Sequence, residues 1–118
     1  MRIGIFDSGL GGLTVAASIK KEIPQAQLVY FGDTARVPYG PKSKGTIQRY
    51  AKQDANFLLS KHIDILVIAC NTATSFALEL LKKEYNLPII GVVEPGVKAA
   101  LTASKEAIIG IILSLIHI

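Results

Sequence analysis

Short apolar segments alternate with amphipathic segments along this sequence, and that alternation limits the possible folds more than any other feature. Strands are predicted at residues 2–6, 28–31, 63–69, 88–93 and 107–112, and helical spacing occurs at 13–22, 46–61, 71–83 and 97–104. Continuous apolar strands that alternate with helices are typical of a parallel sheet covered by helices on both faces. The sequence therefore predicts a doubly wound α/β fold.

Proline, glycine and small polar residues indicate where these elements end. Pro24 is expected to stop the first helix, because proline cannot continue a helical hydrogen-bond ladder. Residues 34–43 contain two prolines and a glycine, which favours a structured loop. Asn71 or Thr72 can cap the third helix, and the Glu-Pro-Gly segment at residues 94–96 is predicted to form a turn.

The polar and glycine-rich segments fall at one edge of the predicted sheet. Residues 7–9, 32–40 and 70–72 each follow a strand directly. The carboxyl ends of parallel strands lie at the same edge, and ligands of open α/β sheets bind there. This convergence predicts a ligand site, whereas His62 precedes a strand and is expected at the opposite edge.

Two side chains at the ligand edge can carry out proton chemistry. Cys70 lies between a strand and a helix N-terminus, where unpaired N–H groups stabilise a thiolate. The alternative for a lone cysteine is a buried apolar role. Asp7 ends the first strand, where its carboxylate can orient an ammonium group, accept a proton or cap a helix. With one cysteine and two histidines, the sequence shows no metal-ligand spacing and no Ser-His-Asp arrangement.

The glycine-rich segment DSGLGGL at residues 7–13 departs from nucleotide-binding patterns. Thr14 stands where the dinucleotide fingerprint has glycine or alanine, and Thr46 stands where a Walker A pattern over residues 40–46 requires lysine. The glycines can instead let backbone N–H groups approach a carboxylate at a helix start. A tight turn that needs positive φ is the structural alternative, and the two are compatible.

Composition excludes several classes of protein. The 13 Lys and Arg residues exceed the 9 Asp and Glu residues by only 4, and they are scattered, which favours a solvated surface over a nucleic-acid interface. The hydrophobic content of 50% argues against intrinsic disorder. One cysteine allows no disulfide within the chain and favours a cytosolic location. No apolar run approaches the roughly 18 residues of a membrane span, and no secretory signal is expected.

Four motifs of this sequence resemble the successive signatures of the glutamate racemases, in the aspartate/glutamate racemase family. They are DSGLGGL at residues 7–13, GDTARVPYG at 32–40, ACNTA at 69–73 and GVVEPG at 91–96. Their order and spacing also match, and the resemblance covers residues 1 to 112. The GDTAR segment favours the glutamate enzyme over the aspartate and hydantoin racemases.

The resemblance implies an isomerase that interconverts L- and D-glutamate without a cofactor or a metal, and that supplies D-glutamate for bacterial peptidoglycan. It implies a cytoplasmic homodimer that binds neither nucleic acid nor membrane, with two pseudo-symmetric, flavodoxin-like α/β domains. Cys70 would be one of two acid/base cysteines, with Asp7 assisting it. The residues that match the family's substrate-binding positions are Asp7, Ser8, Tyr39, Gly40, Asn71 and Thr72.

The sequence departs from the family in lacking the second catalytic cysteine and the Thr-His that follows it. We expect residues 1–94 to form the first α/β domain, incomplete because its C-terminal return segment is missing. Residues 95–112 would form a linker and the start of the second domain. Residues 113–118 resemble a translated sequencing adapter and are expected to be a non-native tail, with a short natural terminus as the alternative. The expectation is a truncated racemase that is inactive alone.

Two other functions are compatible with the same residues. A non-catalytic module could use the strand-end loops to bind an amino acid or another small anion. A receiver-like domain could accept phosphate on Asp7, although Cys70 occupies the place at which such a domain usually carries its acceptor aspartate.

Overall fold

A sheet of four short parallel strands forms the centre of the protein. A computed structural model describes residues 1–104, 106 and 108–111. Its strands are β1 (Arg2–Asp7), β2 (Gln27–Gly32), β3 (Ile65–Ile68) and β4 (Ile89–Gly91). Their order in the sheet is β2-β1-β3-β4, and each neighbouring pair is parallel. The predicted α/β architecture with a parallel sheet is confirmed.

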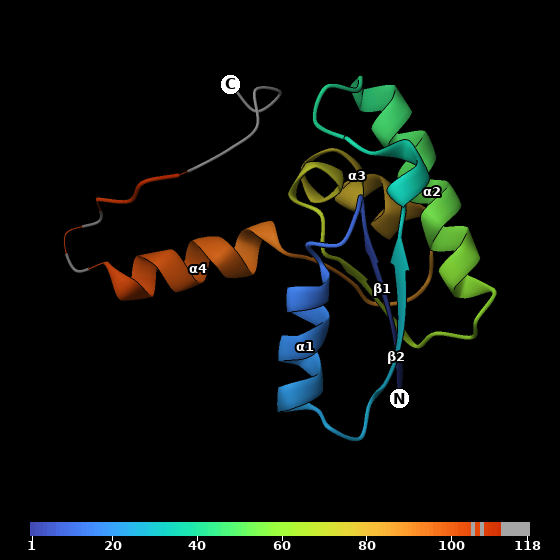
Figure 1. Cartoon of the computed structure of the whole chain (residues 1–118), viewed down its shortest axis with the longest axis horizontal. Helices are drawn as coiled ribbons and strands as arrows, with labels where there is room; N and C mark the ends of the chain where they lie inside the picture. Colours follow the sequence, from blue (N-terminus) through green and yellow to red (C-terminus); the bar gives the residue numbers. More distant parts are fainter. Residues whose placement is uncertain (105, 107, 112–118) are drawn as a thin grey trace.

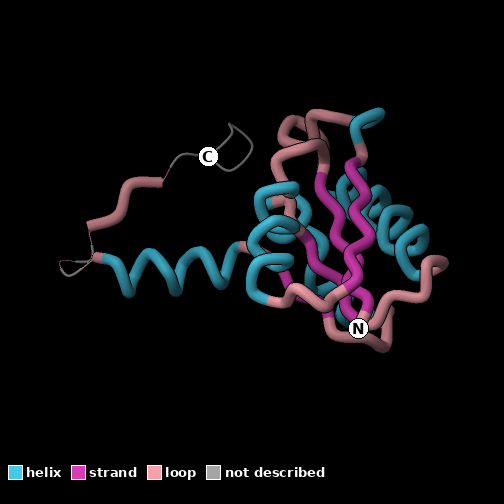
Figure 2. Tube along the Cα trace, turned by 60° about the horizontal axis from the view of Figure 1, so that its bottom comes forward, coloured by secondary structure: helices cyan, strands magenta, loops and turns pink. Residues whose placement is uncertain are grey.

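Helices cover both faces of this sheet (Figure 2). The helices are α1 (Leu13–Glu22), α2 (Lys44–Leu59), α3 (Asn71–Glu84) and α4 (Val93–Ala103), and a short 3-10 turn, η1 (Thr34–Arg36), follows β2. Helix α1 packs on one face of the sheet, and α2 and α3 pack on the other. The doubly wound arrangement is therefore confirmed as well.

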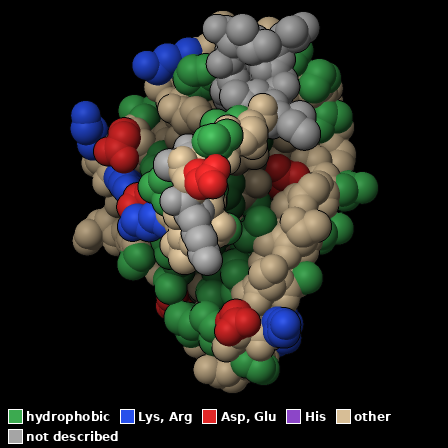
Figure 3. All heavy atoms as spheres, turned by 90° about the vertical axis from the view of Figure 1, so that its left-hand side faces the viewer, with side chains coloured by type: hydrophobic (Ala, Val, Ile, Leu, Met, Phe, Trp, Pro, Cys, Tyr) green, Lys and Arg blue, Asp and Glu red, His purple; other side chains and the backbone are tan. Residues whose placement is uncertain are grey.

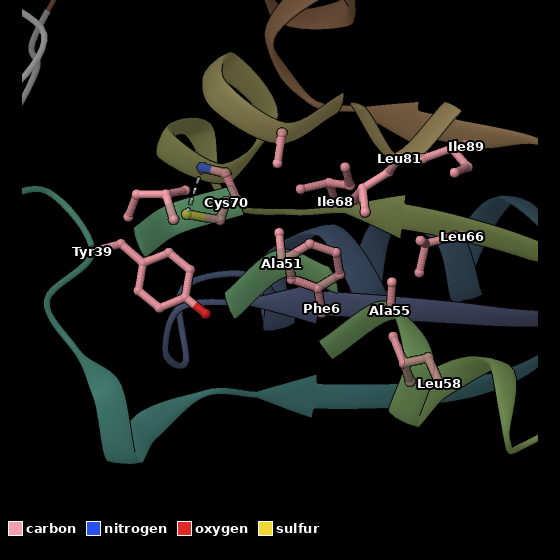
Figure 4. Packing of buried hydrophobic residues seen from close by; sticks show 13 residues of the cluster. Phe6, Tyr39, Ala51, Ala55, Leu58, Leu66, Ile68, Cys70, Leu81 and Ile89 are labelled. Atoms are coloured by element: carbon pink, nitrogen blue, oxygen red, sulfur yellow. Dashed lines mark hydrogen bonds between the residues drawn. The ribbon is translucent and has the colours of Figure 1, made fainter. Parts of the chain in front are cut away.

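Alternate residues of the strands supply the two halves of the core. Ile5 of β1 and Val67 of β3 lie on the α1 side. Phe6, Leu66 and Ile68 point to the opposite face, where they pack against α2 and α3 in the cluster drawn in Figure 4. Successive strand side chains point to opposite faces of a sheet. An uninterrupted apolar strand is thus what a sheet with two covered faces requires.

Helices α1 and α2 follow the sequence prediction closely. Helix α1 ends at Glu22, two residues before Pro24. Helix α2 starts at Lys44, two residues before the predicted start, because the Ser43 hydroxyl accepts a hydrogen bond from the Thr46 amide at 3.3 Å and caps the helix. It ends at Leu59 instead of residue 61.

The turn predicted at residues 94–96 is wrong, because these residues form the first turn of α4. Proline is tolerated in a first turn, where its missing N–H would have had no partner in the helix. The Gly96 amide donates to the carbonyl of the N-cap residue, Val92, at 3.2 Å, so the helical hydrogen bonding begins directly after Pro95. Helix α4 therefore starts at Val93 and not at residue 97.

The strand predicted at residues 107–112 is absent from its described part, residues 108–111, which is irregular. Ile108 and Ile111 are 80% and 73% exposed, and none of the four described strands pairs with this segment. A strand needs a hydrogen-bonded neighbour, so an apolar run alone does not produce one here. Residues 107, 112 and the predicted tail 113–118 lie outside the described residues.

Helix α4 projects from the rest of the protein (Figure 1). Its Val97 and Leu101 side chains are 52% and 56% exposed. Figure 3 views this end of the molecule, where apolar side chains are visible at the surface. Within the described residues, no helix has both the length and the apolar character needed to span a membrane.

Candidate functional site

The carboxyl ends of β1, β2 and β3 meet at one edge of the sheet, as predicted. The Asp33 amide donates to the Asp7 carbonyl at 2.9 Å, and the Ala69 amide donates to the Phe6 carbonyl at 2.8 Å. The segments after these three strands are therefore neighbours. His62 precedes β3 at the opposite edge, in a left-handed conformation with a φ of 56°, so the prediction for it is confirmed.

The Asp7 carboxylate organises the loop that follows β1. Its Oδ2 atom accepts hydrogen bonds from the Gly12 amide at 3.0 Å and the Gly9 amide at 3.2 Å, and the residue is buried. The glycine loop thus does present N–H groups to a carboxylate, but that carboxylate belongs to the protein. Because Gly12 is the N-cap of α1, the Asp7 charge also lies favourably at a helix N-terminus.

The glycines of this loop are needed for close packing, not for an unusual backbone conformation. None of the described glycines has a positive φ, so the turn expected to need one is not formed. A Cβ atom on Gly12 would instead lie 2.7 Å from Asp7 Cβ and 2.8 Å from Ala69 Cβ. The loop can lie this close to the ends of β1 and β3 only because this position has no side chain.

A hydrogen bond from Tyr30 of β2 connects this strand to the same loop. The Tyr30 hydroxyl donates to the Gly9 carbonyl at 2.9 Å. Burial, reinforced by the charge of Asp7, raises the pKa of Tyr30 to about 12. The hydroxyl therefore keeps its proton at neutral pH and remains a hydrogen-bond donor.

Cys70 joins β3 to α3 and is itself the N-cap of the helix. Its Sγ atom accepts a hydrogen bond from the Ala73 amide at 3.4 Å, drawn as a dashed line in Figure 4. The predictions that Asn71 or Thr72 caps α3 are therefore wrong, because both are already helical residues. The Cys70 residue is 6% exposed, and its sulfur lies where the helix presents unpaired N–H groups.

The other residues expected to bind substrate lie at the same edge of the sheet but differ in exposure. Ser8 and Gly40 are half-buried and Asn71 is exposed, whereas Thr72 is buried in the first turn of α3. Tyr39 is buried in the same apolar cluster as Cys70 (Figure 4). Its phenol thus supports the loop from within the core.

A buried polar network, which the sequence did not predict, holds the loop after β2 against α2. Arg36 donates to Asp33 Oδ2 at 2.7 Å and to Asp54 Oδ1 at 2.8 Å, and it also donates to Gln53. The Tyr39 hydroxyl lies 2.5 Å from Asp33 Oδ2 and 2.8 Å from Asp54 Oδ2. The network thus ties the segment that contains Tyr39 and Gly40 to a helix.

Burial shifts the pKa values of two members of this network upward. It raises the pKa of Asp54 to about 6, and the charge of Asp33 acts in the same direction, while the contacts with Tyr39 and Arg36 oppose it. Burial and the two carboxyl groups also raise the pKa of Tyr39 well above its usual range. A sequence signal for the network exists, because Asp54 stands at helical spacing from the inward-facing Ala51 and Leu58.

The sequence matches the protein-family model for Asp/Glu/Hydantoin racemase over residues 13–113. The chain belongs to this racemase family. It is 59% identical over 112 residues to the glutamate racemase of Aquifex aeolicus, a match that covers 95% of this chain and 44% of that protein. The glutamate racemase of Aquifex pyrophilus is 58% identical over 112 residues, with the same coverage.

Solved racemase structures share the fold described above. The structure of the glutamate racemase from Aquifex pyrophilus matches with a TM-score of 0.87 and 59% identity, covering 89% of this chain and 42% of that one. The glutamate racemase of Francisella tularensis, solved in complex with D-glutamate, matches with a TM-score of 0.78 and 41% identity, covering 84% and 38%. The chain thus spans less than half the length of each of these racemases.

Proposed function

We propose that this chain carries one half of a glutamate racemase site, centred on Cys70. The observation that carries the proposal is the position of the thiol, which lies at a helix N-terminus on the ligand edge of the sheet. The identity of 59% to a glutamate racemase over 95% of the chain supports glutamate as the substrate. The complex of the Francisella racemase with D-glutamate supports the same substrate.

The chemistry requires two acid/base groups on opposite faces of the substrate. The Cα–H of glutamate is a weak acid, so a thiolate must remove its proton on one face while a thiol delivers a proton on the other. Cys70 supplies one of these groups, and the family's second cysteine supplies the other. Polar groups at the edge, from Ser8, Asn71 and Thr72, would hold the substrate carboxylate as negative charge develops at Cα.

Asp7 has a second role in this proposal. Its position at the end of β1, beside the strand that leads to Cys70, suits a carboxylate that assists proton transfer or orients the substrate ammonium group. Its Oδ2 atom already accepts two loop amides, so the same residue also shapes the loop. Tyr39 and Gly40 contribute through the loop that the buried network holds.

The domain arrangement follows from the same proposal. Residues 1–94 would form the first domain and residues 95–112 would lead into a second domain, with the boundary inside the first turn of α4. Asn71 and Ser75 line one side of a groove whose other side includes Val97 of α4, so the ligand edge continues toward this junction. The complete enzyme would be a cytoplasmic homodimer that supplies D-glutamate for peptidoglycan.

The test is a chimera in which the matched 112 residues of this chain replace their counterpart in the Aquifex pyrophilus racemase, to which they are 58% identical. We expect the chimera to interconvert L- and D-glutamate, measured by circular dichroism of the amino acid, and the 118-residue chain to show no conversion, because it has one cysteine. A folded but inactive chimera would contradict the proposal. Glutamate binding without conversion would favour the non-catalytic binding module instead.

A further inference from the structure

The buried network around Tyr39 contains more hydrogen-bonding contacts than there are protons to form them when both aspartates are ionised. The Tyr39 hydroxyl has one proton, yet its oxygen lies within hydrogen-bond distance of Asp33 Oδ2 and of Asp54 Oδ2. The Arg36 protons do not fill either of these two contacts, because the guanidinium donates to Asp33 Oδ2 and Asp54 Oδ1 from its own nitrogens. One short oxygen–oxygen contact therefore lacks a proton if both aspartates are ionised.

A proton on Asp54 supplies the missing hydrogen for the second contact. Tyr39 then donates to Asp33, and Asp54 Oδ2 donates to the Tyr39 oxygen, which still has lone pairs to accept. The network becomes one guanidinium and one carboxylate, so it is electrically neutral. Neutrality is favourable here because Asp33 and Asp54 are 4% and 1% exposed, and burying an unpaired charge is costly.

We propose that Asp54 is a positioning residue: when it is protonated, it donates a hydrogen bond to the Tyr39 oxygen, and this bond fixes the loop of residues 33–40 against α2. The consequence for the site rests on the proposed function, because this loop presents the Tyr39–Gly40 segment at the ligand edge. The protonation itself does not depend on that function.

Within the part of the chain that the structure describes, the charged groups that act on Asp54 are few. The charged and titratable groups that face it from the loop are Asp33, Arg36 and Tyr39. On its own helix, the Tyr50 ring packs under the Arg36 guanidinium, 4.1 Å from ring centroid to Cζ. The strand side chains in this core cluster are apolar, and the ion pair between α2 and α3, Lys52–Glu84, is solvent-exposed.

The direction of the pH effect follows from the raised pKa. A carboxyl that binds its proton more tightly in the folded state stabilises the fold fully below its unfolded pKa, and that stabilisation is lost as pH rises through its folded pKa. For Asp54 this window runs from 3.8 to about 6. The unfolding equilibrium constant of the wild type should therefore rise by about 100-fold across the window, relative to a variant that cannot ionise.

The test compares Asp54→Asn with Asp54→Ala in the 118-residue chain. Asparagine has the same shape, its amide can donate to Tyr39 while its carbonyl accepts from Arg36, and it does not ionise. We expect Asp54→Asn to unfold at a similar urea concentration to the wild type at pH 4 and at a higher one at pH 7. Asp54→Ala should be destabilised at both pH values, because Arg36 and Tyr39 lose a partner.

Carbon-13 NMR of the aspartate carboxyl groups measures the proton directly. We expect the Asp54 carboxyl carbon to titrate near pH 6, well above the ordinary range of an aspartate. Titration within that ordinary range, or parallel pH profiles of the wild type and Asp54→Asn, would overturn the proposal. Both measurements use the chain without substrate, so they separate a failure of this inference from a failure of the proposed racemase activity.

The positioning role has its own readout in the chimera. We expect Asp54→Ala to raise KM for glutamate more than it lowers kcat, and Asp54→Asn to restore KM at pH 6. Unchanged KM in a folded Asp54→Ala chimera would show that the network does not position the binding loop.

Discussion

Replacing Cys70 with serine is expected to reduce kcat of the chimera by at least about 10³-fold. Removing a general acid/base group typically costs about 10²- to 10⁴-fold, and a serine hydroxyl is a far weaker acid than a thiol. The fold should survive the change, because Cys70 caps α3 and serine is among the favoured N-cap residues. The measurement is kcat in both reaction directions, with far-UV circular dichroism as the check on folding.

Two further variants make this result specific to the thiol. Cys70→Ala should lose activity equally and also lose the cap, at a cost of about 1 kcal/mol in unfolding free energy. His62→Asn should leave the rate unchanged, because His62 lies at the opposite edge and asparagine tolerates its φ of 56°. A Cys70→Ser chimera with more than a tenth of the parent rate would show that the sulfur is not an acid/base group.

Replacing Gly32 with alanine is expected to destabilise the protein by about 3 kcal/mol. The added Cβ would lie 2.4 Å from the Gly9 carbonyl oxygen, which belongs to the backbone and cannot rotate away. That oxygen also accepts the Tyr30 hydroxyl, so moving it breaks a hydrogen bond as well. Overpacking commonly costs about 1–3 kcal/mol, and a lost hydrogen bond adds about 1 kcal/mol.

Gly45→Ala is the matched control, because a Cβ at that position meets no atom within 4 Å. Gly45 lies in the first turn of α2, where alanine is neutral or stabilising by up to about 1 kcal/mol. Urea unfolding followed by circular dichroism measures both variants. Equal stability of the two would mean that the β2 end does not pack against the glycine loop as described.

The fold was predictable where the apolar pattern decides it. Uninterrupted apolar strands and intervening amphipathic helices predicted the parallel sheet covered on both faces, and α1 has the predicted bounds. The pattern failed at residues 94–96 and 108–111. A Glu-Pro-Gly segment can form a turn or the start of a helix, and the outcome depends on whether the proline falls in the first helical turn. An apolar run becomes a strand only beside another strand.

The site was predictable in its location but not in its internal contacts. Strand ends identified the edge that contains Asp7 and Cys70, because parallel strands bring their carboxyl ends together. The pattern did not reveal that Asp7 accepts two amides of its own loop, nor that Cys70 caps α3. Such contacts depend on angstrom-scale loop geometry, which residue spacing does not determine.

The central claim, that Cys70 moves a proton on one face of glutamate only, is tested most directly by racemisation in deuterium oxide. With L-glutamate and the chimera, we predict that D-glutamate formed early carries deuterium at Cα while the remaining L-glutamate keeps its proton, as NMR of both enantiomers can measure. Two groups on opposite faces give this result, because the incoming deuteron comes from the second cysteine. Early D-glutamate that retains the substrate's proton would show that a single group transfers it, and would contradict the account.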